Sequence, residues 1–301
     1  MAVVGLGTYR CRDVPTAARA AIATGVRVID TAPVYAHGQA QRGLAPALRA
    51  CPRASVSTKV GHMTSRQAEA AQRSGLITAS EASRRHSIAP AYLAHQITVN
   101  ANELARSRLD LLYLHNPEYD AHGDRSRLRS QITQAFEECE HACHQGLIDG
   151  YGVATWNGFT DGAFTVEDLL SAARDAAGSN HSHLKGIQLP VSLVQLTPLA
   201  EAVNGFGPIA EASAAGLQVW ASAPLHGGEL VDMITSELAE FIGSDLSPAE
   251  AALAVVASTP GLTGVLLSAS SETHWRVAQG VFRRPSIPFP QLRRICHVLG
   301  A

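Results

Sequence analysis

Four side chains that could together protonate a carbonyl oxygen stand at or just after the ends of three short apolar runs: Asp30, Tyr35, Lys59 and His115. A tyrosine hydroxyl is a poor acid at neutral pH, but a nearby ammonium group favours the phenolate and so eases proton donation. Lys59 would supply that ammonium group, and Asp30 would be its counter-ion. His115 could hydrogen-bond the carbonyl oxygen and orient the substrate. The four residues therefore predict a site that protonates a carbonyl oxygen as hydride or another nucleophile arrives.

The apolar runs that position these residues are typical of buried parallel strands, because they are apolar throughout and do not alternate. We expect eight strands, at residues 2–8, 26–29, 55–59, 109–114, 150–156, 184–189, 217–222 and 264–267. Helical segments separate them, so the pattern predicts an α/β protein, a (β/α)8 TIM barrel with a parallel eight-stranded barrel and outer helices. We expect a single domain over residues 1–301. In such a barrel the C-terminal strand ends share one face, so the four residues should open into one pocket.

Helix signals lie between these strands. Asp13 should cap a helix over residues 17–23, Pro90 suits the first turn of another helix, and Thr165 with Asp168 has the spacing of a capping box. Further helices are expected at residues 41–50, 132–147, 207–216, 230–242, 247–258 and 272–282. The polar stretch at residues 61–86 is longer than a usual loop of this kind, which is typical of a functional or mobile segment.

Composition excludes several classes of partner. The 301 residues carry a formal net charge of −2, which gives no electrostatic basis for binding nucleic acid or an anionic membrane. No apolar run reaches the roughly 18–20 residues that span a bilayer, and the first residues lack the basic and apolar regions of a signal peptide. The five cysteines are scattered and odd in number. We therefore expect a reduced, cytoplasmic protein without nucleic-acid or membrane partners and without a metal site.

The chain resembles the aldo-keto reductase superfamily along nearly its whole length. The pieces that carry the resemblance are residues 5–8 (GLGT), 25–32 (GVRVIDTA) with Tyr35, 57–59 (STK), 109–115 (LDLLYLH), 152–154 (GVA), Gln188 and 258–261 (STPG). Longer inserts around residues 85–90 and 181–190 look like a less-studied bacterial and plant branch. The resemblance implies a (β/α)8 barrel, NADPH at the C-terminal face, and reduction of a small-molecule carbonyl. It also implies Tyr35 as the general acid, Lys59 and Asp30 as its tuning pair, and His115 as the group that positions the carbonyl.

The resemblance also implies a set of cofactor-binding residues: Thr8, Thr155, Gln188, Ser222, Pro224, Leu225, Ser268, Ser270, Ser271 and His274. Several of them depart from the family pattern. Thr155 replaces the asparagine that holds the nicotinamide carboxamide, and it can make fewer hydrogen bonds. Ser222 stands where an aromatic residue often stacks on the nicotinamide. Ser270 stands at the basic position that meets the 2′-phosphate, and Glu272 adds an acid there. Ser270, Ser271 and the following helix N-terminus could still hold a phosphate.

Two further hypotheses remain open. The same barrel could be a cofactor-independent lyase, dehydratase or cyclase that uses Tyr35, Lys59 and His115 for proton transfer alone, or a barrel kept for binding without catalysis. The loop histidines His37, His62 and His226 follow three of the expected strands and could add a second acid-base group.

Cysteines and histidines also crowd together on the fourth expected helix. Cys139 and Cys143 are four residues apart, as two metal ligands would be, but they fall on the helix's apolar stripe. Core cysteines are therefore the preferred interpretation.

Overall fold

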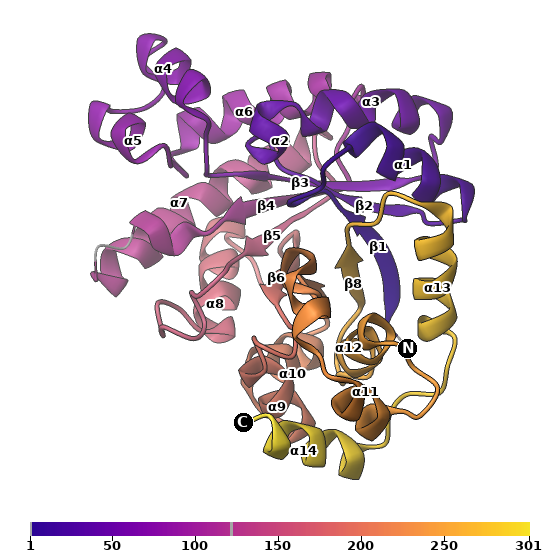
Figure 1. Cartoon of the computed structure of the whole chain (residues 1–301). Coiled ribbons are helices and arrows are strands. Elements are labelled where there is room, and N and C mark those ends of the chain that lie inside the picture. Colours follow the sequence, from indigo (N-terminus) through magenta and orange to yellow (C-terminus); the bar gives the residue numbers. More distant parts are fainter. Residues whose placement is uncertain (1, 121–122) are drawn as a thin grey trace. The chain divides into compact units, whose positions relative to one another are not determined.

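The computed structural model describes residues 2–120 and 123–301 and has a closed barrel of eight parallel strands, arranged in chain order from β1 to β8. This confirms the predicted (β/α)8 barrel (Figure 1). The strands are β1 (Val3–Gly7), β2 (Val28–Asp30), β3 (Ser55–Val60), β4 (Leu111–His115), β5 (Tyr151–Ala154), β6 (Leu184–Pro190), β7 (Gln218–Ser222) and β8 (Gly264–Leu267). His115 is the last residue of β4, whereas the sequence placed it just after the strand.

Helices follow the strands around the barrel. They are α1 (Val14–Ala23), α2 (Tyr35–Gly38), α3 (Ala40–Ala50), α4 (Ser65–Arg73), α5 (Ala79–Arg84), α6 (Pro90–Glu103), α7 (Arg125–His144), α8 (Val166–Ala177), α9 (Thr197–Val203), α10 (Gly207–Ala214), α11 (Ser236–Ile242), α12 (Pro248–Ala257), α13 (Glu272–Phe282) and α14 (Phe289–Val298), with the 3-10 helices η1 (Pro117–Asp120) and η2 (His226–Met233). The bounds of β8 and α13 match the sequence-based ranges.

The described residues group into two compact units, residues 2–29 with Gln188–Ala301 and residues Asp30–Ile187. In the first unit, β8 pairs in parallel with both β1 and β7. In the second unit, β4 pairs in parallel with both β3 and β5, and this register sets Lys59 opposite Tyr113 and His115 opposite Ala154. The single domain over residues 1–301 stays a prediction.

Local signals fix several helix starts. Asp13 caps α1 by accepting a hydrogen bond from the Thr16 backbone N–H at 3.0 Å, as predicted. Thr165 and Asp168 form the predicted capping box of α8 even though aspartate replaces the usual glutamate or glutamine. α6 begins at Pro90, where a missing N–H costs nothing.

The prediction for residues 61–86 was wrong in one respect, because that stretch contains two helices, α4 and α5, which lie together in Figure 1. Each begins with a capping box, from Thr64 with Gln67 and from Thr78 with Glu81. Both signals are visible in the sequence, but most of the intervening residues are polar and give little apolar periodicity. The single helix predicted at residues 230–242 was also wrong, since η2 ends at Met233 and α11 starts after the cap residue Thr235. Helices α9 and α14 were not predicted.

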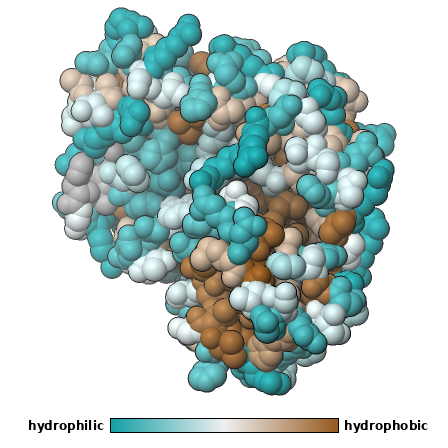
Figure 2. Space-filling model, in the orientation of Figure 1, coloured by the Kyte–Doolittle hydropathy of each residue, from teal (hydrophilic) through white to brown (hydrophobic). Residues whose placement is uncertain are grey.

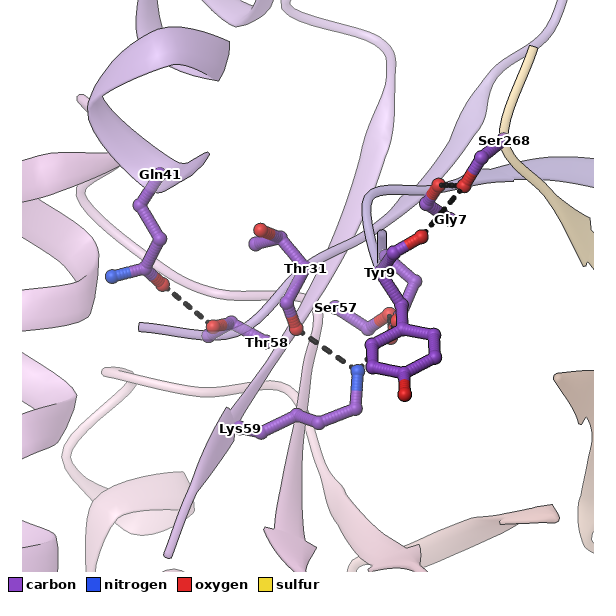
Figure 3. Close-up of polar contacts among 9 residues, drawn as sticks. Gly7, Tyr9, Thr31, Gln41, Ser57, Thr58, Lys59 and Ser268 are labelled. Carbon is purple, nitrogen blue, oxygen red and sulfur yellow. Dashed lines mark hydrogen bonds and ion pairs between the residues drawn. The ribbon is translucent and has the colours of Figure 1, made fainter. Parts of the chain in front are cut away.

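A buried polar network behind β3 holds the strand that carries Lys59. The Thr58 hydroxyl donates to the Gln41 side-chain oxygen at 2.6 Å (Figure 3). Gln41 donates to Asn100 at 3.0 Å, and Asn100 donates to the Lys59 backbone oxygen at 3.1 Å. All four residues are buried. A satisfied buried network of this kind rigidifies its surroundings, so β3 is a firm support for Lys59.

The face shown in Figure 2 has many hydrophilic side chains over α4 and α5, whereas hydrophobic side chains gather over the region of α9 and α10. Phe206, just before α10, is one exposed apolar residue of the first unit. No helix within residues 2–120 or 123–301 is long and apolar enough to cross a membrane.

Candidate active site

The centre of the candidate site is the buried ion pair of Lys59 and Asp30. The Lys59 Nζ atom lies 2.5 Å from Asp30 Oδ2. It donates a second hydrogen bond to the Thr31 backbone oxygen at 3.0 Å (Figure 3). The Ser57 hydroxyl donates to the other carboxylate oxygen of Asp30 at 2.8 Å. A buried charge pair is tolerated when its remaining donors and acceptors are satisfied, and this pair has such partners.

Burial governs the charge of Lys59. Removal from water lowers the pKa of the Lys59 ammonium group, and the adjacent Asp30 carboxylate offsets part of that effect. The ammonium group lies 5.2 Å from the centre of the Tyr35 ring. This proximity is what the predicted role of Lys59 beside Tyr35 requires.

Tyr35 is held by a tight turn after β2. Its backbone N–H donates to the Ala32 oxygen at 3.1 Å, and the next two residues, Ala36 and His37, adopt left-handed backbone angles with φ of 47° and 54°. Such angles are costly for side chains other than glycine and are found where the surrounding structure fixes them. The ring of Tyr35 then lies edge-on to the ring of His115, with 5.7 Å between the ring centres.

His115 is buried, and its surroundings favour the uncharged imidazole. Burial lowers the pKa of its imidazole well below the usual value, and the positive charge of Lys59 lowers it further. Its Nδ1 atom is buried and has no hydrogen-bond partner among the residues that the structure describes. A neutral imidazole can still donate one hydrogen bond, which suits the predicted role of positioning a carbonyl. The structure thus brings all four predicted catalytic residues together within the second unit.

Two more histidines pack against His115. The ring of His62 lies 4.9 Å from the ring of His115 and 4.7 Å from that of His86. His86 is fully buried, and its Nε2 atom donates to the His115 backbone oxygen at 2.8 Å. Gly61 permits this packing, because a Cβ atom there would come within 2.5 Å of the His115 backbone oxygen. We call His62, His86 and His115 the histidine cluster.

The carboxylate of Glu118, from η1, contacts the residues that follow β5, where the nicotinamide contact was expected. Its Oε1 atom accepts from the Thr155 hydroxyl at 2.6 Å and from the backbone N–H groups of Trp156 and Asn157 at 3.2 and 3.3 Å. The Thr155 hydroxyl in turn accepts from the Gly158 N–H at 2.7 Å. Thr155 is buried, and its hydroxyl proton is committed to Glu118. This geometry does not fit a threonine that donates to a nicotinamide carboxamide.

The predicted phosphate-binding residues lie in the first unit at the start of α13. Ser271 is the N-cap of this helix and accepts from the His274 backbone N–H at 3.2 Å. Ser270 and His274 are exposed. Glu272 pairs with Arg276 at 2.6 Å, so one acid and the nearest arginine partly neutralise each other. The start of an 11-residue helix, preceded by exposed Ser270 and capped by half-buried Ser271, fits a phosphate group.

Other predicted cofactor residues also lie in the first unit. Ser268 follows β8, and its hydroxyl donates to the backbone oxygens of Gly7 and Tyr9 (Figure 3). Thr8 and Gln188 are buried, after β1 and within β6. The remaining three, Ser222, Pro224 and Leu225, stand at the end of β7 or just after it. Their roles as cofactor ligands stay predictions.

The family model of the aldo/keto reductase family matches residues 5–241, which is most of the chain. The chain belongs to the aldo/keto reductase family. A D-threo-aldose 1-dehydrogenase from a Pseudomonas species is 29% identical over 160 residues. That match covers 50% of this chain and 44% of the relative, so the chain spans less than half of the relative's length.

Solved structures of this family share the barrel. An aldo/keto reductase from Klebsiella pneumoniae, in complex with NADP and acetate, is 20% identical with a TM-score of 0.67, covering 99% of this chain and 91% of its own. A glycerol dehydrogenase from Gluconobacter oxydans is 18% identical with a TM-score of 0.71, covering 98% and 90%. At this level of identity the likeness shows the fold.

Sequence reasoning missed several polar residues of this aldo/keto reductase site, namely Ser57, His86, Asn116, Glu118 and Tyr119. Glu118 could have been found, because an acid two residues after the Asn116 that follows β4 stands near a strand end. His86 could not, since it lies 29 residues before His115 and only the pairing of residues 61–63 with 85–87 brings it there.

Cys139 lies in the core as the sequence predicted, whereas Cys143, one turn further along the same helix, is only half-buried. Cys139 is fully buried on α7, and burial raises its pKa well above the usual value. All five cysteines are free. Among the residues with described positions, no group of three or more histidine, cysteine, aspartate and glutamate side chains is arranged to hold a metal ion.

Proposed function

We propose that this protein is an NADPH-dependent oxidoreductase that reduces the carbonyl group of a small molecule, with Tyr35 as the general acid. The observation that carries the proposal is the buried Lys59–Asp30 pair with its ammonium group 5.2 Å from the Tyr35 ring. A lysine is costly to bury, and here its charge lies beside a phenol whose ring is edge-on to that of His115. Family membership supports the same reaction class.

Each residue has one task in this reaction. Neutral His115 donates a hydrogen bond to the carbonyl oxygen and holds it beside the Tyr35 hydroxyl. Lys59 stabilises the negative charge that develops on the phenol as its proton passes to that oxygen. Asp30 and Ser57 hold Lys59 in place, and the Thr58–Gln41–Asn100 network holds the strand. When bound, NADPH would supply the hydride to the carbonyl carbon.

The chain's residues fit the phosphate end of NADPH better than the nicotinamide end. Ser270, Ser271 and the first turn of α13 would hold the 2′-phosphate. Thr155 is committed to Glu118, so Gln188 would have to hold the carboxamide without it. The proposal is therefore a reductase with a complete proton donor and a weakened cofactor site.

A panel assay tests this proposal. Purified protein is mixed with millimolar NADPH and a set of aldehydes and ketones, and absorbance at the nicotinamide band is followed. Aldoses of the threo series are included in the oxidative direction with NADP and NAD, because the Pseudomonas relative is named for that reaction. We expect carbonyl-dependent oxidation of NADPH with at least one small aldehyde. Absence of turnover across the panel in both directions would contradict the proposal.

The Glu118–Thr155 contact also favours a second candidate function. If no group at β5 holds a nicotinamide, Tyr35, Lys59 and His115 could serve a cofactor-independent lyase, dehydratase or cyclase. Product formation from a carbonyl substrate in buffer without nicotinamide separates this candidate from the reductase.

A further inference from the structure

His62 is the one member of the histidine cluster whose side chain reaches solvent. It is half-buried, whereas His86 is fully buried and His115 is only 8% exposed. Its ring lies edge-on to the His115 ring at 4.9 Å and to the Tyr119 ring at 4.7 Å. His62 therefore packs against the imidazole proposed to hold the carbonyl and against the phenol of Tyr119.

Asn116 supports His62 in a way that suits a base. The Asn116 Nδ2 atom lies 3.0 Å from His62 Nε2 and donates to it. A half-turn of this amide presents its oxygen instead, which then accepts a proton carried on Nε2. With the amide turned this way, Nε2 carries the proton and Nδ1 is the basic nitrogen that takes the substrate proton. The same amide oxygen then holds the imidazolium, as the asparagine of a Cys-His-Asn site orients its histidine.

The backbone fixes the position of this pair. Asn116 directly follows His115, has a left-handed φ of 51°, and donates its backbone N–H to the Ala154 oxygen at 2.7 Å. His62 is tied down through Gly61 and through the Met63 N–H, which donates to the Arg85 oxygen at 2.8 Å. Both side chains are therefore placed by the strand ends that also carry Lys59 and His115, which is how catalytic groups of a barrel are positioned.

We propose that His62 is a catalytic base that removes the proton from the carbon next to the substrate carbonyl, so that this site also catalyses enolisation and isomerisation of hydroxy-carbonyl compounds. The inference rests on the proposed carbonyl site, and it adds an activity that requires no nicotinamide. It also names a substrate class, aldehydes or ketones with a hydroxyl group on the adjacent carbon.

The step balances without an oxidant or reductant. His62 takes the proton of the adjacent C–H bond, and the electron pair of that bond forms the carbon–carbon double bond of an enediol. The carbonyl π electrons move to the oxygen, which takes the proton of Tyr35 while His115 holds it. Return of the His62 proton to the same carbon regenerates the substrate. Delivery to the former carbonyl carbon, with the second hydroxyl proton returning to Tyr35, converts an aldose into a ketose.

Deuterium exchange tests the proposal on the intact protein. Glyceraldehyde is incubated with the protein in D₂O without nicotinamide, and deuterium at its second carbon and in dihydroxyacetone is followed by NMR. We expect exchange above that of buffer and of the Tyr35→Phe variant. We expect His62→Gln to lower it about 100-fold or more, as for loss of a general base, and imidazole added to His62→Ala to restore part of it. His95→Gln is the matched control, because His95 is an exposed histidine on α6 of the same unit, and it should leave exchange unchanged.

The outcomes separate this inference from the reductase proposal. Exchange no faster than buffer, in protein that oxidises NADPH with a carbonyl substrate, overturns the inference alone. Exchange lost in His62→Gln with NADPH oxidation reduced far less supports it, whereas an equal loss of both activities shows a structural role for His62 and overturns it. Exchange without any NADPH oxidation supports the inference while the reductase proposal fails. The exchange rate of the wild-type protein relative to buffer tests the inference even if a variant does not fold.

Discussion

The proton-transfer residues and the predicted phosphate-binding residues at the start of α13 differ in how firmly the structure holds them. Asp30, Lys59 and His115 are buried, and hydrogen bonds from half-buried Ser57 and from buried Asn100 and His86 support them. Ser270 and His274 are exposed, and the nearby acid Glu272 is offset by a surface pair with Arg276. Exposed pairs of this kind contribute little energy.

This difference has a physical reason. A buried charge such as Lys59 cannot lose its partner without a large penalty, so its neighbours are constrained together. A serine on an exposed helix start carries no such penalty, and its replacement costs the fold little. Acid-base chemistry is therefore expected to be complete in this protein, and cofactor affinity is expected to be the property that has changed.

The largest expected effect is the loss of turnover when the proton donor is removed. Tyr35→Phe should lower turnover about 10²–10⁴-fold with the fold intact, because only the hydroxyl is removed. Lys59→Met should be similarly damaging, because it removes the charge that tunes the phenol. Steady-state kinetics measures both. Tyr92→Phe is the control, since Tyr92 is a buried phenol on α6. Near-normal activity of Tyr35→Phe would show that Tyr35 is not the proton donor, and the loop histidines would become the candidates.

The departures from the family pattern in the predicted cofactor residues should lower the affinity for NADPH. Loss of a basic contact to the 2′-phosphate removes about 1.5–3 kcal/mol, and loss of the amide contact at β5 removes about 0.5–1.5 kcal/mol more. If these add, NADPH binds roughly 30- to 2000-fold more weakly than in relatives with both contacts. Fluorescence titration with NADPH and NADH measures this. Saturation at micromolar NADPH would contradict the weakened site.

Burial of neutral His115 should appear in the stability of the fold. An unfolded histidine takes up a proton near pH 6.5, whereas folded His115 stays neutral because its pKa is well below that value. The unfolded chain then binds more protons, so His115 should lower the free energy of unfolding by about 1.4 kcal/mol per pH unit as pH falls below about 6.5. Urea titrations at pH 7, 6.5 and 5.5 measure this. A wild-type curve no steeper than that of His115→Gln over this range would contradict it.

The smallest effect is expected at Glu272. Glu272→Gln removes an exposed acid from the start of α13, where a phosphate should bind, and leaves Arg276 without its partner. NADPH should bind a few-fold more tightly, at most about fivefold, while NADH affinity stays the same. The ratio of the two dissociation constants reports the change. An equal gain for both cofactors would show that the 2′-phosphate does not bind there.

The sequence predicted the barrel and gathered Tyr35, Lys59 and His115 correctly, because strand ends of a parallel barrel share a face. The distances between these side chains could not be predicted from the sequence. The pairing that brings His86 to His115 from a different segment could not be predicted either. Helices α4 and α5 were missed because capping boxes mark a start without apolar periodicity to continue it. The Glu118–Thr155 bond was missed because the identity of a residue does not say whether its hydroxyl is already committed.

Isotope transfer from the cofactor tests the central claim most directly. NADPH carrying deuterium at the transferable position of the nicotinamide is incubated with the protein and a carbonyl substrate that the panel assay identifies. The product is then analysed by mass spectrometry and NMR. We predict one deuterium at the former carbonyl carbon of each product molecule, with the oxygen-bound proton coming from solvent through Tyr35. A product that forms without deuterium, at the same rate with NADPH omitted, would contradict a reductase and identify a proton-transfer enzyme on the same barrel.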